Sequence, residues 1–362
     1  MNKLHLHLPH LDHNYHLIRS QLSPQTSLIG VVTAGAYGSD MIVIAKRLEH
    51  LGIDSLAVAY ASEGEILREA GIKIPILVFY PQLDGLQKLL EVKLEPTIYS
   101  VPLLNEFRKL VKNKKYNNYP VHIKYNTGLN RVGFAPKQVS WILDQFQGSL
   151  FELKSIYSHL AASETSKDNL LNKKQIECFL SIKEQHQANT KTTPKFHLLN
   201  SSGLFNYPEY KMDAVRCGIA LHGFANQPHW DSKLMAVSIL ESKISQIHQV
   251  KKGEYVGYNH AWKAARDSRI ATLPIGHADG IGRHFGNQKT VVYIQDKPAP
   301  IIGNVCMDML MIDVTEVSCQ EGTIVSLFGK KQNAAQFAEK GGTISYELLS
   351  SIGPRVQRVI HY

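Results

Sequence analysis

The chain has 362 residues, 44% of them hydrophobic, which is more than one core usually holds, so we expect two domains. The formal net charge is +9, but the basic residues are spread along the chain rather than gathered in a stripe or tail, which argues against a nucleic-acid-binding protein. No apolar run approaches the roughly 20 residues that cross a bilayer, and the N-terminus lacks the apolar stretch of a signal peptide, so we expect a cytoplasmic protein without a membrane segment.

Short apolar segments alternate with longer segments of helical period from about residue 10 to residue 225. Eight of the short segments are candidate strands: 28–32, 55–60, 74–79, 96–99, 121–125, 153–158, 196–199 and 214–217. Most are nearly continuously apolar, as is typical of strands buried on both faces of a parallel sheet. Eight βα units in sequence predict an α/β fold of the (β/α)8 type, a TIM barrel, rather than an open doubly wound sheet.

The pattern changes after residues 226–231, where strands separated by turn residues replace the βα units. The candidate strands are 244–250, 268–273, 290–294, 299–302, 310–314 and 323–328, and helices are expected at 334–340 and 345–352. This pattern predicts a mainly β C-terminal domain. We place the barrel at residues 10–230 and the β-rich domain at residues 231–362.

Polar residues follow five of the predicted barrel strands at the point where each strand ends. They are residues 33–37, 124–131, 158–159, 200–202 and 216–219. The carboxyl ends of parallel barrel strands meet at one mouth, where active sites are built. A single histidine at a strand end is more often structural than catalytic, but five polar clusters at one mouth favour an active site.

Three further motifs resemble a known family. Residues 36–39 read Ala-Tyr-Gly-Ser, residues 56–64 read Leu-Ala-Val-Ala-Tyr-Ala-Ser-Glu-Gly, and residues 303–309 read Gly-Asn-Val-Cys-Met-Asp-Met. With them, nearly the whole chain resembles the alanine racemases, which depend on pyridoxal 5'-phosphate (PLP). PLP acts as an electron sink for the carbanion of the amino acid. The resemblance implies a barrel followed by a β domain, with residues 1–9 forming a strand that joins the C-terminal domain.

The resemblance also implies a set of cofactor-binding residues. The phosphate-binding positions of the family are matched by Tyr37, Ser201, Tyr346 and the backbone amides of Gly218 and Ile219, with Asn200 beside them. Hydroxyl and amide donors suit a phosphate dianion. Arg216 matches the arginine that hydrogen-bonds the pyridine nitrogen, and His159 matches the histidine packed against the ring.

Substrate and partner contacts follow from the same resemblance. Arg131 matches the arginine that contacts the ring hydroxyl and the substrate carboxylate, and Lys124 matches a lysine, carbamylated in many members, that steadies it. Tyr258 matches the second catalytic base, which reaches the active site from the partner subunit of a head-to-tail homodimer. Met307 and Asp308 match the carboxylate-binding segment supplied by the same partner. The implied partners are a second copy of the chain and a small amino acid.

The most informative departure from the family is Thr33. Residues 31–38 read Val-Val-Thr-Ala-Gly-Ala-Tyr-Gly, where the family usually has Val-Lys-Ala-Asn-Ala-Tyr-Gly. That lysine holds PLP as an imine and removes one Cα proton, and a threonine hydroxyl does neither. Lys124 is the nearest lysine in the family layout, but it lies beside the ring rather than under the aldehyde carbon. Other departures around the pocket are Gly35, Ser39, Asp40, Asn126, His222 and His277.

Three hypotheses about function stay open. The first is a racemase of alanine or another amino acid, impaired or inactive because of Thr33. The second is a regulatory or structural protein that has lost catalysis and binds PLP, an amino acid or a protein partner. The third is a divergent enzyme that uses His159, Tyr258 or His277 as bases without an imine. PLP is then bound non-covalently or lost. The cysteines at 178, 217, 306 and 319 are too widely spaced for a zinc site, and nothing indicates a metal.

Overall fold

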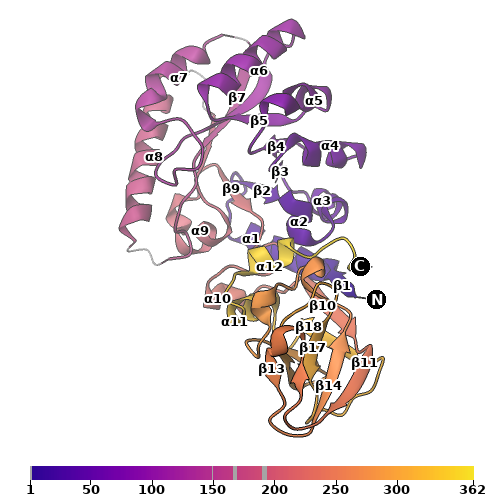
Figure 1. Cartoon of the computed structure of the whole chain (residues 1–362). Coiled ribbons are helices and arrows are strands. Elements are labelled where there is room, and N and C mark those ends of the chain that lie inside the picture. Colours follow the sequence, from indigo (N-terminus) through magenta and orange to yellow (C-terminus); the bar gives the residue numbers. More distant parts are fainter. Residues whose placement is uncertain (1, 149, 166–168, 190–193) are drawn as a thin grey trace.

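Eight parallel strands form one strongly curved sheet in the N-terminal part of the chain (Figure 1). The computed structural model describes residues 2–148, 150–165, 169–189 and 194–362. The strands are β2 (Ser27–Val31), β3 (Ser55–Val58), β4 (Ile76–Val78), β5 (Glu95–Ile98), β6 (Tyr119–Lys124), β7 (Phe151–Tyr157), β8 (Lys195–His197) and β9 (Ala214–Cys217). Their order is β8-β7-β6-β5-β4-β3-β2-β9.

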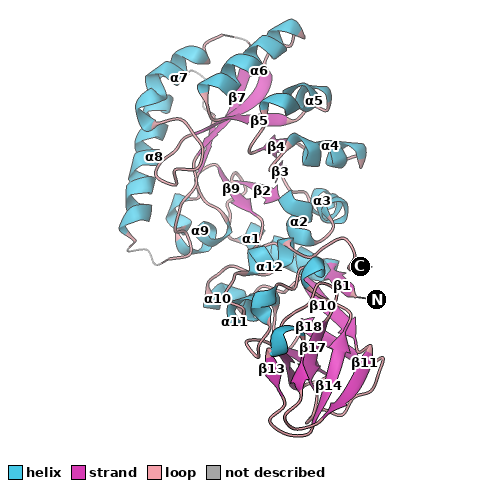
Figure 2. Cartoon of the chain, viewed as in Figure 1, coloured by secondary structure: helices cyan, strands magenta, loops and turns pink. Residues whose placement is uncertain are grey.

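The edge strands β8 and β9 meet, so the sheet nearly closes. The N–H of Asp213 donates to the carbonyl of Phe196 (3.0 Å), and the N–H of Arg216 donates to the carbonyl of Leu199 (3.1 Å). Helices surround the strands (Figure 2). They are α1 (Leu8–Ser20), α3 (Met41–His50), α4 (Ala61–Glu69), α5 (Leu86–Glu91), α6 (Val101–Asn113), α7 (Val139–Gln145), α8 (Leu170–Asn189) and α9 (Ser201–Asn206). The predicted barrel is confirmed.

A nine-stranded, largely antiparallel sheet dominates the C-terminal part, as predicted. In sheet order its strands are β11 (Gln246–Val250), β14 (Ser268–Leu273), β17 (Leu310–Asp313), β16 (Lys297–Ile302), β15 (Val291–Ile294), β18 (Ile324–Phe328), β10 (Ser238–Lys243), β1 (Lys3–His7) and β19 (Gln357–His361). A small ribbon of β12 (Tyr255–Val256) and β13 (Trp262–Lys263) stands apart from it, and the helices are α10 (Pro228–Asp231), α11 (Ala334–Lys340) and α12 (Ser345–Ser350).

The first strand ties the two parts together. β1 runs antiparallel to β10 and parallel to β19, and its Leu4 and Leu6 belong to the C-terminal core. The next element, α1, buries Leu11 and Ile18 in the barrel core. The boundary near residue 230 stays a prediction. Within the described ranges, no helix combines the length and apolarity needed to cross a membrane.

Two strands of the C-terminal sheet escaped prediction, β10 and β19. The buried face of β10 carries Ser238, Leu240 and Ser242, so its alternation does not read as apolar. Ser242 is satisfied by donating to Asn2 Oδ1 at 2.7 Å, a partner distant in sequence. β19 reads Gln-Arg-Val-Ile-His and has no fully buried residue. Both strands depend on neighbours that a local pattern does not reveal.

Candidate functional site

The carboxyl ends of the barrel strands bring the predicted site residues to one mouth. The residues at or just after these ends are Thr33 (β2), Lys124 and Arg131 (β6), His159 (β7), Asn200 and Ser201 (β8), and Arg216, Gly218 and Ile219 (β9). Tyr346 joins them from α12, with its ring centroid 6.0 Å from that of Tyr37. Asn200 caps α9 by accepting from the N–H of Gly203 (2.9 Å).

Thr33 is held by a carboxylate. Its hydroxyl donates to Glu63, at 3.0 Å from Oε2 and 3.2 Å from Oε1. The same carboxylate accepts from the backbone N–H groups of Ala34 (2.6 Å) and Ala59 (2.8 Å). Glu63 therefore joins the loop after β2 to the loop after β3, and it fixes the direction of the Thr33 hydroxyl. Sequence reasoning missed this role of Glu63, although it lies inside one of the three family motifs.

The turn α2 (Thr33–Gly38) is left-handed from its second residue onward. The φ angles of Ala34, Gly35, Ala36 and Tyr37 are 52°, 66°, 52° and 57°. Left-handed backbone costs roughly 1–2 kcal/mol for each residue with a side chain. Strain of this kind persists where the surrounding structure holds it, often at functional sites. Here the turn directs the Tyr37 ring toward Gly218.

Hydroxyl and amide groups converge where α2, α9 and the loop after β9 meet. The Tyr37 hydroxyl lies so close to Gly218 that a Cβ there would be 1.9 Å from it. Ser201 Oγ accepts from the N–H groups of Gly218 (3.1 Å) and Ala220 (3.2 Å). Burial raises the pKa of Tyr37 and of Tyr346 well above the ordinary value, so both phenols remain hydrogen-bond donors at neutral pH. Such a set suits an anion.

Arg216 is buried beneath the mouth and strongly held. Its Nη2 donates to the carbonyls of Ser158 (2.8 Å) and Leu198 (2.9 Å), and its Nη1 donates to Nδ1 (2.5 Å) and to the carbonyl (3.5 Å) of His197. Among the described residues, none accepts from its Nε–H. Burial lowers the pKa of Arg216 to about 10, so the guanidinium stays charged at neutral pH. The mouth therefore offers a fixed cation with one unused donor.

Aromatic rings and further cations surround Arg216. The Lys124 Nζ lies 5.6 Å from the ring centroid of Tyr80, and the Arg131 guanidinium lies 5.4 Å from the same centroid. Burial, followed by the charges of Arg216, Arg131 and Lys124, lowers the pKa of His159 well below its ordinary value, so its imidazole is neutral. Sequence reasoning missed Tyr80, which follows a predicted strand without any motif to mark it.

Burial, then Arg131 and Arg216, lowers the pKa of Lys124 to about 7 from the ordinary 10.5. Between these values the folded chain has lost the Lys124 proton and the unfolded chain retains it. Unfolding then takes up a proton, so this group makes the free energy of unfolding rise with pH. We expect Lys124→Met to reduce that rise by up to about 1.4 kcal/mol per pH unit. Urea denaturation between about pH 7 and pH 10 measures this slope. Equal slopes in both proteins would contradict the lowered pKa of Lys124.

Three predicted residues are not brought to the mouth of their own chain. Tyr258 and Met307, in the C-terminal part, are 65% and 59% exposed. Asp308 pairs with Arg355 (2.8 Å), which also bonds the buried Asp279. No hydrogen bond or ion pair that involves described residues joins these three to the strand-end residues. Nor do the described residues contain a group of three or more His, Cys, Asp or Glu side chains that could hold a metal ion.

Sequence comparisons match both parts of the chain to one family. The family described as "Alanine racemase, N-terminal domain" matches residues 6–226, and "Alanine racemase, C-terminal domain" matches residues 237–360. The alanine racemase of Treponema denticola is 34% identical over 369 residues, covering 98% of this chain and 96% of that protein. An amino-acid racemase of Enterococcus faecalis is 33% identical over 98% of this chain and 50% of its own length.

Alanine racemases are also among the solved structures that this chain resembles. The alanine racemase of Bacillus anthracis with bound L-Ala-P superposes with a TM-score of 0.91 at 29% identity, covering 100% of this chain and 95% of that chain. The alanine racemase of Bartonella henselae with covalently bound pyridoxal phosphate has a TM-score of 0.90 at 27% identity, covering 99% of both chains.

Proposed function

The chain belongs to the alanine racemase family, and on this premise we propose that its barrel mouth binds PLP without a covalent bond. We further propose that Thr33 stands at the position of the family's lysine, so that racemisation of alanine or another small amino acid is strongly reduced or lost. The unused Nε–H of Arg216, beneath a set of hydroxyl and amide donors, is the observation that carries the binding proposal.

The residues at the mouth fit PLP on two counts. Tyr37, Ser201 and Tyr346 supply neutral hydroxyl donors around the backbone of Gly218, as a phosphate requires. Arg216 supplies a buried donor whose geometry is fixed by its other bonds, as a ring nitrogen requires. When bound, PLP supplies an electron sink that acidifies the Cα–H of an amino acid. The neutral His159 and the cation of Arg131 are then available to pack on the ring and to pair with a carboxylate.

One of the two acid–base groups that racemisation requires is missing from this chain. The Thr33 hydroxyl is occupied as a donor to Glu63, and it has no amine that could take a Cα proton. Loss of one positioned acid–base group typically costs about 10²–10⁴-fold in rate. Within the proposed homodimer, Tyr258 supplies the remaining base from the partner subunit. Met307 and Asp308 would approach the substrate carboxylate from the same side.

The exposed surface around Tyr258 supports a head-to-tail homodimer. Tyr255, Tyr258, Met307 and Met309 are 50%, 65%, 59% and 47% exposed, respectively. The side chain of Asn304 donates to the carbonyl of Tyr258 (3.1 Å), which connects the segment before Met307 to the segment of Tyr258. Large exposed apolar side chains gathered in one region commonly mark an interface.

Titration of the purified protein with PLP, followed by absorbance, tests the binding proposal. We expect one saturable site per chain, the spectrum of the free aldehyde, and full release of PLP on dialysis. After borohydride treatment, peptide mass spectrometry should find no single lysine modified in proportion to the protein. Stoichiometric modification of one lysine would show that another amine replaces the missing one, and absence of saturable binding would overturn the proposal.

A further inference from the structure

The interior of the barrel contains buried polar side chains beside a small apolar cluster. Ile29, Ala57, Leu77 and Ala214, from β2, β3, β4 and β9, form the apolar cluster. β6, β7 and β8 place His122, Ser155 and His197 inward, where the interiors of such barrels usually carry Val, Ile and Leu. The exposed fractions of these three residues are 7%, 4% and 1%. Buried polar groups are costly unless they are hydrogen-bonded, so their partners matter.

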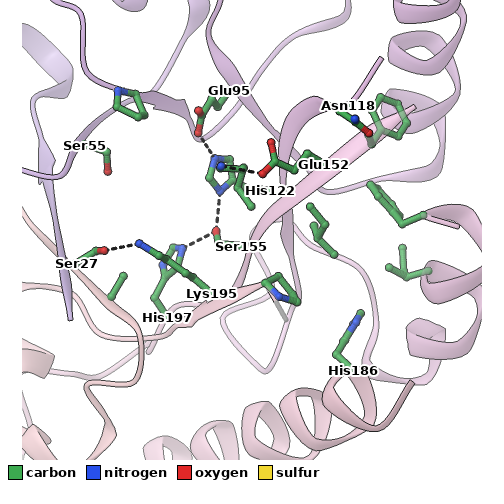
Figure 3. A pocket seen from close by; sticks show the side chains of 18 of the residues that line it. Ser27, Ser55, Glu95, Asn118, His122, Glu152, Ser155, His186, Lys195 and His197 are labelled. Carbon is green, nitrogen blue, oxygen red and sulfur yellow. Dashed lines mark hydrogen bonds and ion pairs between the residues drawn. The ribbon is translucent and has the colours of Figure 1, made fainter. Parts of the chain in front are cut away.

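These three residues connect Glu95 to Arg216 through four hydrogen bonds. Glu95 Oε2 lies 2.9 Å from His122 Nε2, and His122 Nδ1 lies 2.6 Å from Ser155 Oγ. Ser155 Oγ lies 2.9 Å from His197 Nε2, and His197 Nδ1 lies 2.5 Å from Arg216 Nη1. Figure 3 shows the part from Glu95 to His197 as one continuous dashed path. We name the five residues the relay.

The two ends of the relay fix the direction of every bond in it. A guanidinium only donates, so His197 Nδ1 accepts from Arg216, and the proton of the neutral ring is on Nε2. His197 then donates to Ser155, whose only other partner among the described residues is His122 Nδ1. The Ser155 hydroxyl therefore donates to His122, and His122 Nε2–H donates to the carboxylate of Glu95, which only accepts. Burial and the charge of Arg216 lower the pKa of His197 well below its ordinary value, in keeping with a neutral ring.

The relay runs between two ends of the barrel. Glu95 begins β5 and, with His122, Ser155 and His197, borders a cavity of about 1160 Å³ at the amino ends of the strands (Figure 3). Arg216 lies beneath the mouth at the opposite end and forms no ion pair with a described carboxylate. A buried charge without a counter-charge is expensive. Glu95 is the carboxylate to which the hydrogen bonds of Arg216 lead.

The ring of Tyr157 restrains the end of the relay that contains His197 and Arg216. It stacks on His197 with centroids 4.8 Å apart and planes at 6°, and the Arg216 guanidinium lies 5.1 Å from the same ring centroid. Its hydroxyl is bonded to Thr97 Oγ1 at 2.9 Å. His197 and Arg216 thus have little freedom to rotate, so a change in the hydrogen bonding of His197 bears directly on Arg216.

We propose that Glu95 is a positioning residue for the binding site at the far end of the barrel. Through His122, Ser155 and His197 it fixes the hydrogen bonds of Arg216, and it thereby leaves the Arg216 Nε–H aimed at the ring nitrogen of a ligand. The identity of that ligand rests on the proposed function. The relay itself is a property of the ligand-free protein and can be tested without PLP.

The first test uses ¹⁵N NMR of the histidine rings in the ligand-free protein. We expect His122 and His197 to be neutral with the proton on Nε2, and Glu95→Gln to shift the ring signals of both. Glu152→Gln is the matched control, since Glu152 borders the same cavity but pairs with the surface residue Lys154. Its histidine signals should match the wild type. If Glu95→Gln leaves the His197 signals unchanged, the relay does not reach Arg216 and the proposal is wrong.

The second test is a double-mutant cycle on PLP affinity. Glu95→Gln replaces a charge-assisted bond by a neutral one, so we expect PLP binding to weaken about three- to tenfold. Ser155→Ala breaks the relay in its middle and should cost a similar factor. The double variant should be no worse than the weaker-binding single variant, because a broken relay no longer transmits the change at Glu95. Losses that multiply in the double variant would overturn the proposal. If the wild type binds no PLP, the proposed function fails, and the NMR result alone decides on the relay.

Discussion

Thr33→Lys is expected to bond PLP covalently and to racemise alanine about 10²–10⁴-fold faster than the wild type. The reason is that one amine at this position would serve both as covalent anchor and as base, beside the other groups that we propose bind PLP. The Glu63 carboxylate would keep its bonds to the N–H groups of Ala34 and Ala59, so the loop should retain its course. Chiral chromatography of D-alanine formed from L-alanine measures the gain.

Thr33→Met is the matched control, because methionine is long and unbranched but has no amine. It should leave the racemisation rate at the wild-type level. Borohydride reduction of Thr33→Lys loaded with PLP should modify residue 33 and no other lysine in proportion to the protein. A modified residue 33 with no gain in rate would mean that the remaining groups no longer support racemisation. The departures at Gly35, Asn126 and His277 would then be the next positions to revert.

The fold was predictable from the sequence because the barrel strands appear as short apolar segments that alternate with segments of helical period. Most of the eight candidate strands are nearly continuously apolar, and their order along the chain leaves a barrel as the simplest arrangement. β10 is a strand that this local pattern did not predict. Its buried face contains Ser238 and Ser242, and the hydroxyl of Ser242 finds its partner in Asn2, which is 240 residues away in the sequence. Periodicity cannot report a contact of that kind.

The candidate site was predictable only in part. Strand-end residues such as Thr33 and Arg216 could be found because parallel strands bring their carboxyl ends together. The relay could not, since Glu95, His122 and Ser155 lie within strands where an alternating side chain is expected to be apolar. Their meeting depends on the register of neighbouring strands, in which His122 lies opposite Ser155. Tyr258, which we propose faces the partner subunit, had no local signal, and only the family resemblance drew attention to it.

Gly218→Ala is expected to weaken PLP binding about ten- to a hundredfold, the value of one lost hydrogen bond to a charged group. A Cβ at this position would lie 1.9 Å from the Tyr37 hydroxyl oxygen and 2.6 Å from Cζ, so the ring must move away. Tyr37 cannot shift easily, since it lies in the strained left-handed turn α2. The phosphate would lose the Tyr37 donor and meet a methyl group close to its place.

Fluorescence titration with PLP measures this loss, and inorganic phosphate as competitor separates the phosphate contacts from the ring contacts. Gly85→Ala is the control, since the nearest atom to its new Cβ would be Ala61 Cβ at an ordinary 3.7 Å. Tyr37→Phe removes the hydroxyl without adding a methyl group, and it should weaken PLP binding while the urea midpoint stays near that of the wild type. If Gly218→Ala and Tyr37→Phe both bind PLP as tightly as the wild type, the phosphate lies elsewhere. The convergence of Tyr37, Ser201 and Tyr346 would then be a packing arrangement of α2, α9 and α12, and Arg216 would have to orient a ligand anchored by other groups.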